Sequence, residues 1–320
     1  MVRIASATPE TIAEAAAVIK NGGLLGLPTE TVYGLAANAL DGRAVARIFE
    51  AKGRPSFNPL IIHVAKPEDA MAFGVFNDAA KEMMAAFWPG PLTMILPRTA
   101  DCPVSDLASA GLPTLAIRCP AHPVARAVIE AAGVPVAAPS ANTSGRLSPT
   151  TPQHVAESLG DAVDMILAAG AASVGLESTV LDLTGEAPVI LRPGAVTPED
   201  VARVLGITPA IDDGQHEAPK SPGQLLRHYA PRTPVRLNAT TLEDGEAYLA
   251  FGPSLMGRNL PDMHKRNLSE QGDLAEAAAN LFGYMHALDG AGCKGIAVAP
   301  IPDTGLGIAI NDRLVRAARG

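Results

Sequence analysis

Short apolar segments bounded by glycine and proline alternate with stretches of helical period along residues 9–206 of this chain. This alternation is typical of a layered domain in which helices cover a sheet. Segments rich in Val, Ile and Leu predict strands at residues 23–27, 60–64, 92–96, 114–118, 134–138, 178–183 and 189–191. The stretches between them predict helices at residues 10–20, 43–51, 78–87, 123–132, 152–159 and 198–205. The pattern therefore predicts an α/β domain, or α+β by some definitions.

The first predicted helix has clear start and stop signals. Thr8 supplies an N-cap hydroxyl, Pro9 fits the first helical position, and Gly22 can end the helix. Its apolar face consists of Ile12, Ala15, Ala16 and Ile19. We expect this face to pack against the sheet.

The sequence changes character between Thr208 and Pro234, where five prolines occur and no period is sustained. This composition is typical of a linker. The residues that follow return to a pattern of strand, strand, helix, strand and helix, whose clearest pieces are 248–251, 274–287, 296–300 and 308–318. We therefore expect a main domain over residues 1–207, a proline-rich linker over 208–233, and a small Rossmann-like domain over 234–320.

Composition and charge exclude several classes of protein. A hydrophobic content of 48% and a charged content of 18% fit neither a disordered chain nor a long coiled coil. The 25 Lys and Arg against 33 Asp and Glu disfavour nonspecific binding to nucleic-acid phosphates. The cysteines, Cys102, Cys119 and Cys293, lack the spacing of a disulfide framework or a metal site. Because no apolar run approaches ~20 residues and no signal peptide is visible, we expect a cytoplasmic protein with no membrane partner.

Polar residues cluster in segment 28–64, around the end of a predicted helix. Lys52 and Arg54 flank Gly53, and Pro55 fixes the turn that follows. Both side chains can therefore point into one space, which suits an anion. The alternative is that they are ordinary cations at a helix C-terminus, where they complement the helix dipole. The P-loop, HExxH and GxSxG motifs of common enzymes are absent from the sequence.

A second cluster, VAAPSANTSGRLSPT at residues 136–150, runs from an apolar strand into small polar residues. Ser140, Asn142, Ser144 and Ser148 could bond a base, ribose or phosphate, and Gly145 allows close approach of the backbone. The alternative is a turn whose Ser and Asn side chains satisfy their own backbone.

Three further candidates, Arg118, Ser178 and Arg192, stand at predicted strand ends beside turn signals. Such arginines are often exposed edge charges. If these strand ends converge with Lys52 and Arg54, they form a strongly cationic pocket inside an acidic protein. That pocket would suit a polyanionic small molecule.

The order PTETVYGL, KGRP, NPL, SAN-SG, STV and LRPG across residues 20–205 resembles the threonylcarbamoyl-adenylate synthases built on the YrdC-like domain. SPGQLLRHYAP, residues 221–231, looks like the linker of the long form of this family, and GLGIAINDRLVRAA looks like its C-terminal domain. The resemblance implies a twisted, mixed sheet with a concave, positively charged face. It also implies that L-threonine, bicarbonate and ATP are combined into threonylcarbamoyl-adenylate and pyrophosphate. That product would pass to the machinery that modifies the tRNA adenosine beside the anticodon.

The resemblance also implies roles for individual residues. Those expected around L-threonine are Thr31, His63, Arg118, Ala138 and Ser178. Those expected to hold ATP are Lys52, Arg54, Asn58, Thr114, Ser140, Ser148, Arg192 and His228, to which the residue pattern adds Asn142. Lys52 and Arg54, on the phosphates, are the expected catalytic residues. Mg²⁺ is expected to be carried by ATP, without a metal site of the protein itself.

The charges of the reactants suggest how such an enzyme works. Threonine, bicarbonate and ATP bring three anions to one place, so alignment and charge neutralisation by Lys52, Arg54, Arg192 and Mg²⁺ are the expected contributions. We expect no single indispensable general base. Replacing Lys52 or Arg54 by Ala should cut activity strongly with little loss of stability. Leu225 and Leu226 stand where a more polar or aromatic pair would be expected, and no chemistry is assigned to the C-terminal domain.

Two other functions remain open from the sequence. One is an RNA-binding or ribosome-associated module that uses the same cationic face without turnover. The acidic charge and the low aromatic content, one Trp and four Tyr, count against it. The other is a different carbamoyl-transferring or adenylating enzyme on this scaffold, which the amine that supports pyrophosphate release would reveal.

Overall fold

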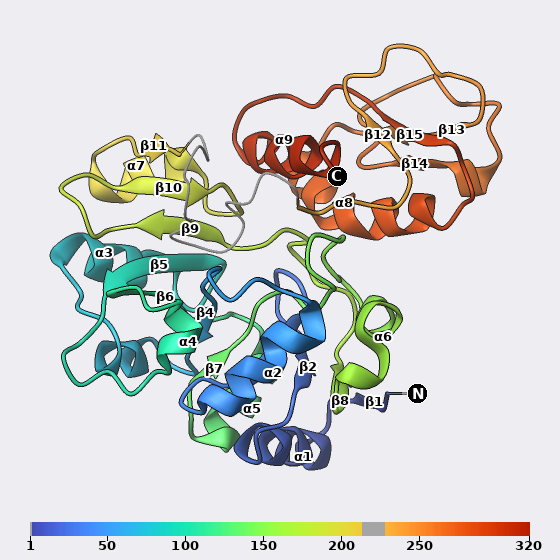
Figure 1. Ribbon diagram of the computed structural model, residues 1–320. Coiled ribbons are helices and arrows are strands. Elements are labelled where there is room, and N and C mark those ends of the chain that lie inside the picture. The colour runs from blue at the N-terminus through green and yellow to red at the C-terminus, as the bar shows by residue number, and fades with distance from the viewer. Residues whose placement is uncertain (1, 213–227) are drawn as a thin grey trace.

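The computed structural model describes residues 2–212 and 228–320, and within them the chain forms one large mixed sheet and one small parallel sheet (Figure 1). The large sheet has the order β1-β8-β2-β3-β7-β4-β6-β5-β9-β10-β11. Its strands are β1 (Ile4–Ser6), β2 (Leu25–Leu27), β3 (Gly34–Asn38), β4 (Ile61–His63), β5 (Leu92–Pro97), β6 (Thr114–Arg118), β7 (Val136–Ala137), β8 (Met165–Ala168), β9 (Thr179–Asp182), β10 (Val189–Arg192) and β11 (Ala210–Ile211). The predicted α/β class and mixed sheet are confirmed.

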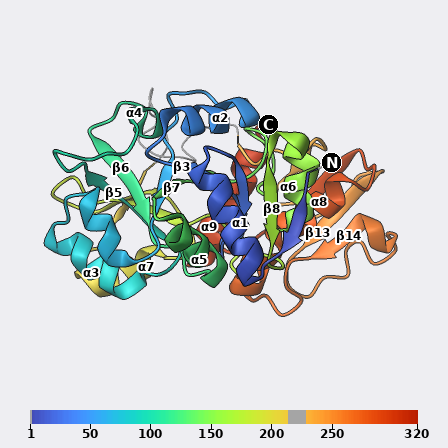
Figure 2. The same ribbon diagram turned by 90° about the horizontal axis from the view of Figure 1, so that it is seen from below.

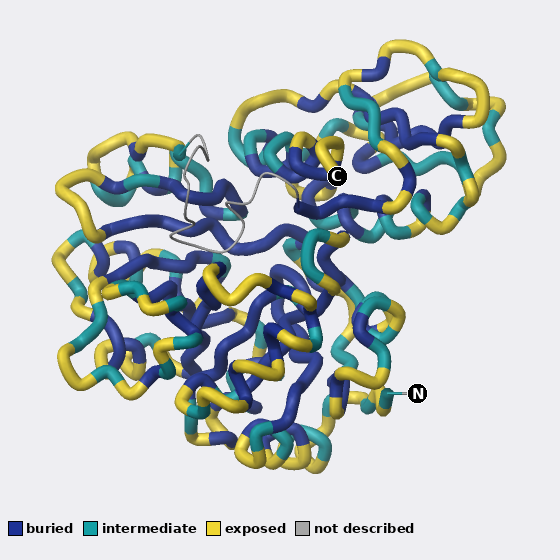
Figure 3. The backbone as a smooth tube through the Cα atoms, viewed as in Figure 1, coloured by how far each residue is buried: buried dark blue, intermediate teal, exposed yellow. Residues whose placement is uncertain are grey.

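Helices cover both faces of the large sheet. They are α1 (Pro9–Lys20), α2 (Gly42–Lys52), α3 (Asp78–Phe87), the single turn α4 (Asp106–Ser109), α5 (Pro123–Ala132), α6 (Pro152–Leu159) and α7 (Pro198–Leu205), with 3₁₀ turns η1 (Pro67–Ala72) and η2 (Gly160–Ala162). Figure 2 shows α1 and α5 side by side, and Ala16 of α1 shares one apolar cluster with Val128 of α5. The buried backbone runs along the strands, whereas the exposed segments lie in the loops and on outer helix faces (Figure 3).

The signals at the first helix are confirmed. Thr8 is the N-cap of α1 and accepts from the backbone N–H of Thr11, and Pro9 occupies the first turn. Ala15, Ala16 and Ile19 are buried, whereas Ile12 is only half-buried and packs at the edge of the same cluster.

The small sheet has the order β12-β15-β13-β14 with every pairing parallel. It consists of β12 (Val235–Arg236), β13 (Glu246–Ala250), β14 (Lys265–Asn267) and β15 (Gly295–Val298), accompanied by α8 (Leu274–Asp289), α9 (Leu306–Ala317) and η3 (Asp262–His264). This is the alternating unit expected of a small Rossmann-like domain. In the part of the chain that the structure describes, no helix combines the length and the apolar character needed to span a membrane.

Some elements were not predicted. No strand was expected at β3, because its sequence GLAAN has small residues of low strand propensity. Its pairing with β2 (Leu25 opposite Ala36) supplies what the local sequence does not. β11 pairs with β10, so the first residues of the expected linker extend the large sheet. Most of that expected linker, including Leu225 and Leu226, lies outside the described residues.

Candidate functional site

Several strands of the large sheet end at one edge. β4 and β6 are parallel, with their last residues, His63 and Arg118, opposite each other. β5 is antiparallel to β6 and begins at that edge, β9 starts beside it, and antiparallel β10 brings Arg192 back to it. The topology therefore gathers the ends of strands that are distant in sequence, as the predicted convergence requires.

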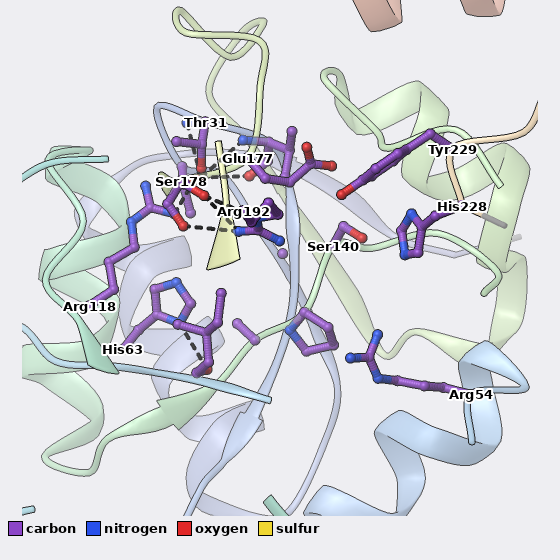
Figure 4. Close-up of a pocket in the computed structure, with 16 residues that line it drawn as sticks. Thr31, Arg54, His63, Arg118, Ser140, Glu177, Ser178, Arg192, His228 and Tyr229 are labelled. Atoms are coloured by element: carbon purple, nitrogen blue, oxygen red, sulfur yellow. Dashed lines mark hydrogen bonds between the residues drawn. The ribbon is translucent and has the colours of Figure 1, made fainter. Parts of the chain in front are cut away.

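A cavity that is partly open to solvent lies at this edge, with about 530 Å³ of space between its walls and its mouth (Figure 4). Nine predicted site residues line it, namely Thr31, Arg54, His63, Arg118, Ala138, Ser140, Ser178, Arg192 and His228. Figure 4 shows Arg118 and His63 on one side of the cavity and Arg54 and His228 on the other. The cavity thus has two ends, joined by Ser178 and Arg192.

The other predicted residues do not line the cavity. Lys52 and Asn58 are 1% exposed, and so is Asn142, whereas Ser148 is fully buried. Thr114 is half-buried at the start of β6. The register of β4 against β6, with Ile61 opposite Ala116, carries Thr114 toward the turn at Asn58.

The turn after α2 places the two predicted cations. Gly53 adopts a left-handed conformation with φ of 57°, which ends the helix and separates Lys52 from Arg54. Lys52 Nζ donates to the carbonyl oxygens of Ser140 (2.5 Å) and Asn142. Arg54 donates from Nε to Asn58 O (3.2 Å) and from Nη2 to Pro59 O (3.0 Å).

Burial makes these cations costly in the absence of an anion. Burial and then the charge of Arg54 hold the pKa of Lys52 well below its usual value. Burial and then Arg192 lower the pKa of Arg54 to about 10. Like charges and desolvation both disfavour the protonated forms, so an anionic ligand would relieve both. Such strongly perturbed cations in a cavity are typical of a functional site.

At the other end, Arg118 is fixed by three partners. It donates to Gly90 O (3.2 Å), Thr31 Oγ1 (2.9 Å) and Glu30 Oε1 (2.5 Å). Burial opposes ionisation of Glu30, but the Arg118 guanidinium outweighs burial and holds the pKa of this carboxyl below its usual value. A guanidinium has five N–H donors, so two remain for a ligand.

His63 is a neutral side chain in this environment. Burial, followed by the charge of Arg118, lowers its pKa to about 3. Its Nδ1 lies 3.2 Å from the carbonyl oxygen of Ile61, which can only accept a hydrogen bond. A proton on Nδ1 would bond this oxygen, and the carbonyl group of Val136 is a second backbone acceptor beside the ring.

Ser178 and Arg192 form the link between the two ends. Arg192 donates from Nε and Nη2 to Ser178 O (3.1 and 2.9 Å), and Ser178 Oγ lies 2.7 Å from Thr93 Oγ1. The backbone of Gly194 passes so close that a Cβ there would lie 2.4 Å from the amide nitrogen of Thr179. The glycine of LRPG therefore lets the β9 and β10 ends meet.

Five buried polar atoms around the cavity have no hydrogen-bond partner among the described residues. They are Nδ2 and Oδ1 of Asn58, Oδ1 of Asn142, Nδ1 of His228 and Oη of Tyr229. An unsatisfied buried group costs roughly 1–3 kcal/mol, so this cluster is the pattern expected of a polar ligand site.

Sequence reasoning missed seven residues of the cavity wall: Thr29, Val32, Gly34, Ile61, Pro139, Glu177 and Tyr229. Thr29 and Val32 belong to PTETVYGL, Glu177 directly precedes Ser178, and Tyr229 directly follows His228. Each of the seven lies within a quoted motif or directly beside one, so proximity to the motif was the available signal. Within residues 2–212 and 228–320, no group of three or more His, Cys, Asp and Glu is placed to hold a metal ion.

Comparison with known proteins supports the motif reading. Residues 17–194 match the family model of Sua5, YciO and YrdC, described as "Telomere recombination", and residues 196–319 match "Threonylcarbamoyl-AMP synthase, C-terminal domain". The chain is 40% identical to the threonylcarbamoyl-AMP synthase of Bacillus subtilis over 97% of its length and 93% of that protein. It is also 40% identical to the Pyrococcus abyssi enzyme over 95% of this chain and 93% of that one.

The crystal structure of P. abyssi Sua5 complexed with L-threonine has the same architecture. It superposes with a TM-score of 0.89 at 36% identity, covering 100% of this chain and 97% of that one. The two family models, and the 40% identity over nearly the whole chain, therefore support the assignment that the motifs and the cavity suggested. This chain belongs to the threonylcarbamoyl-AMP synthase family, in the form that carries the C-terminal domain.

Proposed function

We propose that this protein condenses L-threonine, bicarbonate and ATP into threonylcarbamoyl-AMP with release of pyrophosphate. The observation that carries the proposal is the convergence of Arg54, Arg118 and Arg192 on one cavity at the sheet edge. Three guanidinium groups there can meet a carboxylate at one end and phosphates at the other. The relatives named above act as threonylcarbamoyl-AMP synthases, which supports the same reaction here.

The end formed by Arg118 and His63 suits threonine. The two unused N–H donors of Arg118 match the two oxygens of a carboxylate. A neutral imidazole has one acceptor nitrogen, so His63 can accept a hydrogen bond from an amine or a hydroxyl. Ala138 on the floor has only a methyl group, so it leaves room for the side chain of threonine.

The end formed by Arg54 suits the phosphates of ATP. Arg54 points into the cavity opposite Arg118 (Figure 4), and Lys52 has one N–H donor beyond the two that it gives to carbonyl oxygens. Asn58, Asn142, Ser140 and His228 supply further polar atoms, several of which lack a protein partner. The nucleoside would satisfy these atoms.

The chemistry then needs alignment more than proton transfer. The neutral amine of threonine adds to the carbon of bicarbonate, and loss of water gives a carbamate. A carbamate oxygen attacks the α-phosphorus of ATP, and the bond to the leaving pyrophosphate breaks. Because the reaction brings anions together, fixed cations in a dry cavity lower its barrier. This is a nucleotidyl transfer to a carbamate.

Magnesium would enter as MgATP. Among the cavity-wall residues that the structure describes, Glu177 is the only carboxylate, and each of its oxygens already accepts a hydrogen bond, from Ser148 or from Arg313. Arginines face the phosphate end instead. The ion would therefore be held by the phosphates and would add to the charge neutralisation that Lys52 and Arg54 provide.

The product is a reactive mixed anhydride, which a second enzyme must consume by transferring the threonylcarbamoyl group. We place that acceptor among the tRNA-modifying machinery, as the family resemblance implies, and no stable complex of this chain with nucleic acid is required. A cytoplasmic location follows from the need for ATP and tRNA.

The proposal is tested by pyrophosphate release with ATP, Mg²⁺, bicarbonate and one amino acid at a time. Threonine-dependent release, with the mass of threonylcarbamoyl-AMP in the product, is the expected result. Arg192→Lys should be strongly impaired, whereas Arg98→Lys should not, because Arg98 bonds Asp106 and Val104 O away from the cavity. Pyrophosphate release with a different amine would show that threonine is not the substrate. Salt-sensitive tRNA binding without any turnover would instead support an RNA-binding module.

A further inference from the structure

Glu177 of the cavity wall and Ser148 behind it form a hydrogen-bonded pair that the C-terminal domain contacts from both sides. Ser148 Oγ donates to Oε1 of Glu177. Nε2 of His286, on α8, lies 3.1 Å from the carbonyl oxygen of Ser148. Nε of Arg313, on α9, donates to Oε2 of Glu177 at 2.8 Å. Each member of the pair therefore has its second contact from the small domain.

Arg313 reaches two more segments of the wall. It is fully buried, and its Nη2 donates to the carbonyl oxygen of Pro193 at 2.9 Å. Pro193 directly follows Arg192. The Arg313 guanidinium carbon also lies 5.2 Å from the ring centroid of Tyr229, within range of a cation–π contact. One side chain thus touches the segments that carry Glu177, Arg192 and Tyr229.

The packing around these contacts is dry. Val32, Leu147 and Leu176, from motif loops of the main domain, share one apolar cluster with Phe282 of α8 and Leu314 of α9. Gly175 approaches α8 so closely that a Cβ there would lie 2.5 Å from Ala278 O. Figure 1 shows α8 and α9 on the side of the small domain that faces the large one. The domains therefore meet through the loops of the site.

We infer that Arg313 is a positioning residue for the reaction, and that the C-terminal domain acts on the cavity through it. Arg313 does not line the cavity, so it acts through Glu177 and the Arg192–Pro193 corner. Nη1 of Arg313 is held in turn by Asp312 Oδ2 at 2.6 Å, which fixes the guanidinium plane. A guanidinium presents five N–H donors in a fixed planar fork, whereas the three donors of an ammonium group all radiate from one nitrogen. The inference rests on the proposed function.

Replacing Arg313 tests the inference in the full-length chain. Arg313→Met removes every polar contact, and Arg313→Lys keeps one charge. We expect kcat to fall roughly 10–100-fold in Arg313→Met, because a misplacement of about 1 Å at a reacting site costs on the order of 100-fold. Arg313→Lys should recover part of the loss. The dissociation constant for ATP should rise, whereas the KM for threonine should change less, because His63 and Arg118 lie on strands away from α9.

A matched control separates positioning from simple loss of stability. Arg236 makes a two-contact ion pair with Glu246 inside the small domain, at 2.9 and 2.6 Å, away from the cavity. Arg236→Met should therefore lower Tm without lowering kcat at temperatures where it is folded. Equal loss of kcat in Arg236→Met and Arg313→Met would overturn the inference. So would an Arg313→Met variant with lowered Tm but wild-type kcat and ATP affinity.

A double-mutant cycle with Glu177→Gln tests whether the effect passes through Glu177. We expect the combined variant to lose much less than the product of the two single losses, and multiplicative losses would count against the mechanism. Wild-type turnover with threonine checks the proposed function separately. If the wild type makes no product, the proposed function fails, and the ATP dissociation constants of the same variants still decide whether Arg313 shapes the cavity.

Discussion

The ammonium nitrogen of Lys52 lies 2.5 Å from the carbonyl oxygen of Ser140, which ties the end of α2 to the loop after β7. Its second bond, to Asn142 O, secures the same loop. Lys52 is 1% exposed, so these bonds lie in a dry environment. The side chain thus holds the site together, besides contributing a charge to it.

Replacing Lys52 should therefore affect both activity and stability. Lys52→Met leaves the carbonyl oxygen of Asn142 without a donor and removes one of the two donors to Ser140 O, so we expect a loss of about 1–3 kcal/mol in the free energy of unfolding, measured by urea denaturation. Pyrophosphate release should fall by at least ~100-fold. The sequence had suggested little loss of stability, and burial revises that expectation. A folded variant with wild-type turnover would contradict the role given to Lys52.

ATP should stabilise the protein against heat, because it brings negative charge to desolvated cations. At ~100-fold excess over Kd, a ligand raises the free energy of unfolding by about 2.7 kcal/mol. We expect MgATP to raise Tm in the wild type and to do so much less in Arg54→Gln, measured by calorimetry. Arg98→Gln is the control, since Arg98 lies away from the cavity. An equal rise in Tm on addition of MgATP to Arg54→Gln would show that Arg54 does not bind the phosphates.

Thr31 should matter for threonine more than for ATP. Its Oγ1 accepts from Arg118 and lies 2.9 Å from Thr29 Oγ1, so it fixes the guanidinium that would meet the carboxylate. Thr31→Val should raise the KM for threonine roughly 10-fold, since a hydrogen bond to a charged group is worth about 1.5–3 kcal/mol. Thr99→Val, which removes a bond to Ala72 O elsewhere, should leave both KM values unchanged. A selective rise in the KM for ATP would show that the Thr31 end of the cavity binds ATP and not threonine.

The stacked pair of His154 and His286 predicts an acid-sensitive contact between the domains. The ring centroids are 3.9 Å apart, and burial followed by the neighbouring His286 lowers the pKa of His154 to about 4. Burial also lowers the pKa of His286, against the opposing hydrogen bond to the backbone of Ser148 and the charges of Glu157 and Asp289. The unfolded chain binds a proton near pH 6.5 and the folded chain does not, so stability falls as pH drops from 6.5 toward 4.

His154→Gln should make the pH dependence of stability shallower. Because His154 is only partly buried, we expect a difference of about 1 kcal/mol in the change of unfolding free energy between pH 7 and pH 5. Urea titrations of both proteins at the two pH values measure it. Identical changes in the two proteins would show that His154 is not a source of the acid sensitivity.

The sequence predicted the elements whose signals are local. The capping signals at Thr8 and Pro9 and the apolar strand Thr114–Arg118 were sufficient by themselves. β3 was missed because Ala and Gly carry no strand signal, and its pairing partners fix it instead. Local propensity cannot report pairing with a distant strand.

The site was predicted where motif residues line the cavity and missed where a partner comes from afar. Glu30 and Arg118 are far apart in sequence, and their ion pair follows from the topology alone. Arg313 was quoted within a motif of the C-terminal domain but given no role, because nothing near it in the sequence indicates Glu177. Only the packing of α9 on the loops of the main domain brings these two residues together.

The most direct test of the proposed reaction follows the carbon of bicarbonate into the product. The purified protein is supplied with ATP, Mg²⁺, threonine and ¹³C-bicarbonate, and the nucleotide product is weighed by mass spectrometry. We predict threonylcarbamoyl-AMP that is heavier by one mass unit and is formed in step with pyrophosphate. This product should be lost in Arg192→Lys but not in Arg98→Lys. A product without the labelled carbon, or pyrophosphate release that does not depend on threonine, would contradict it.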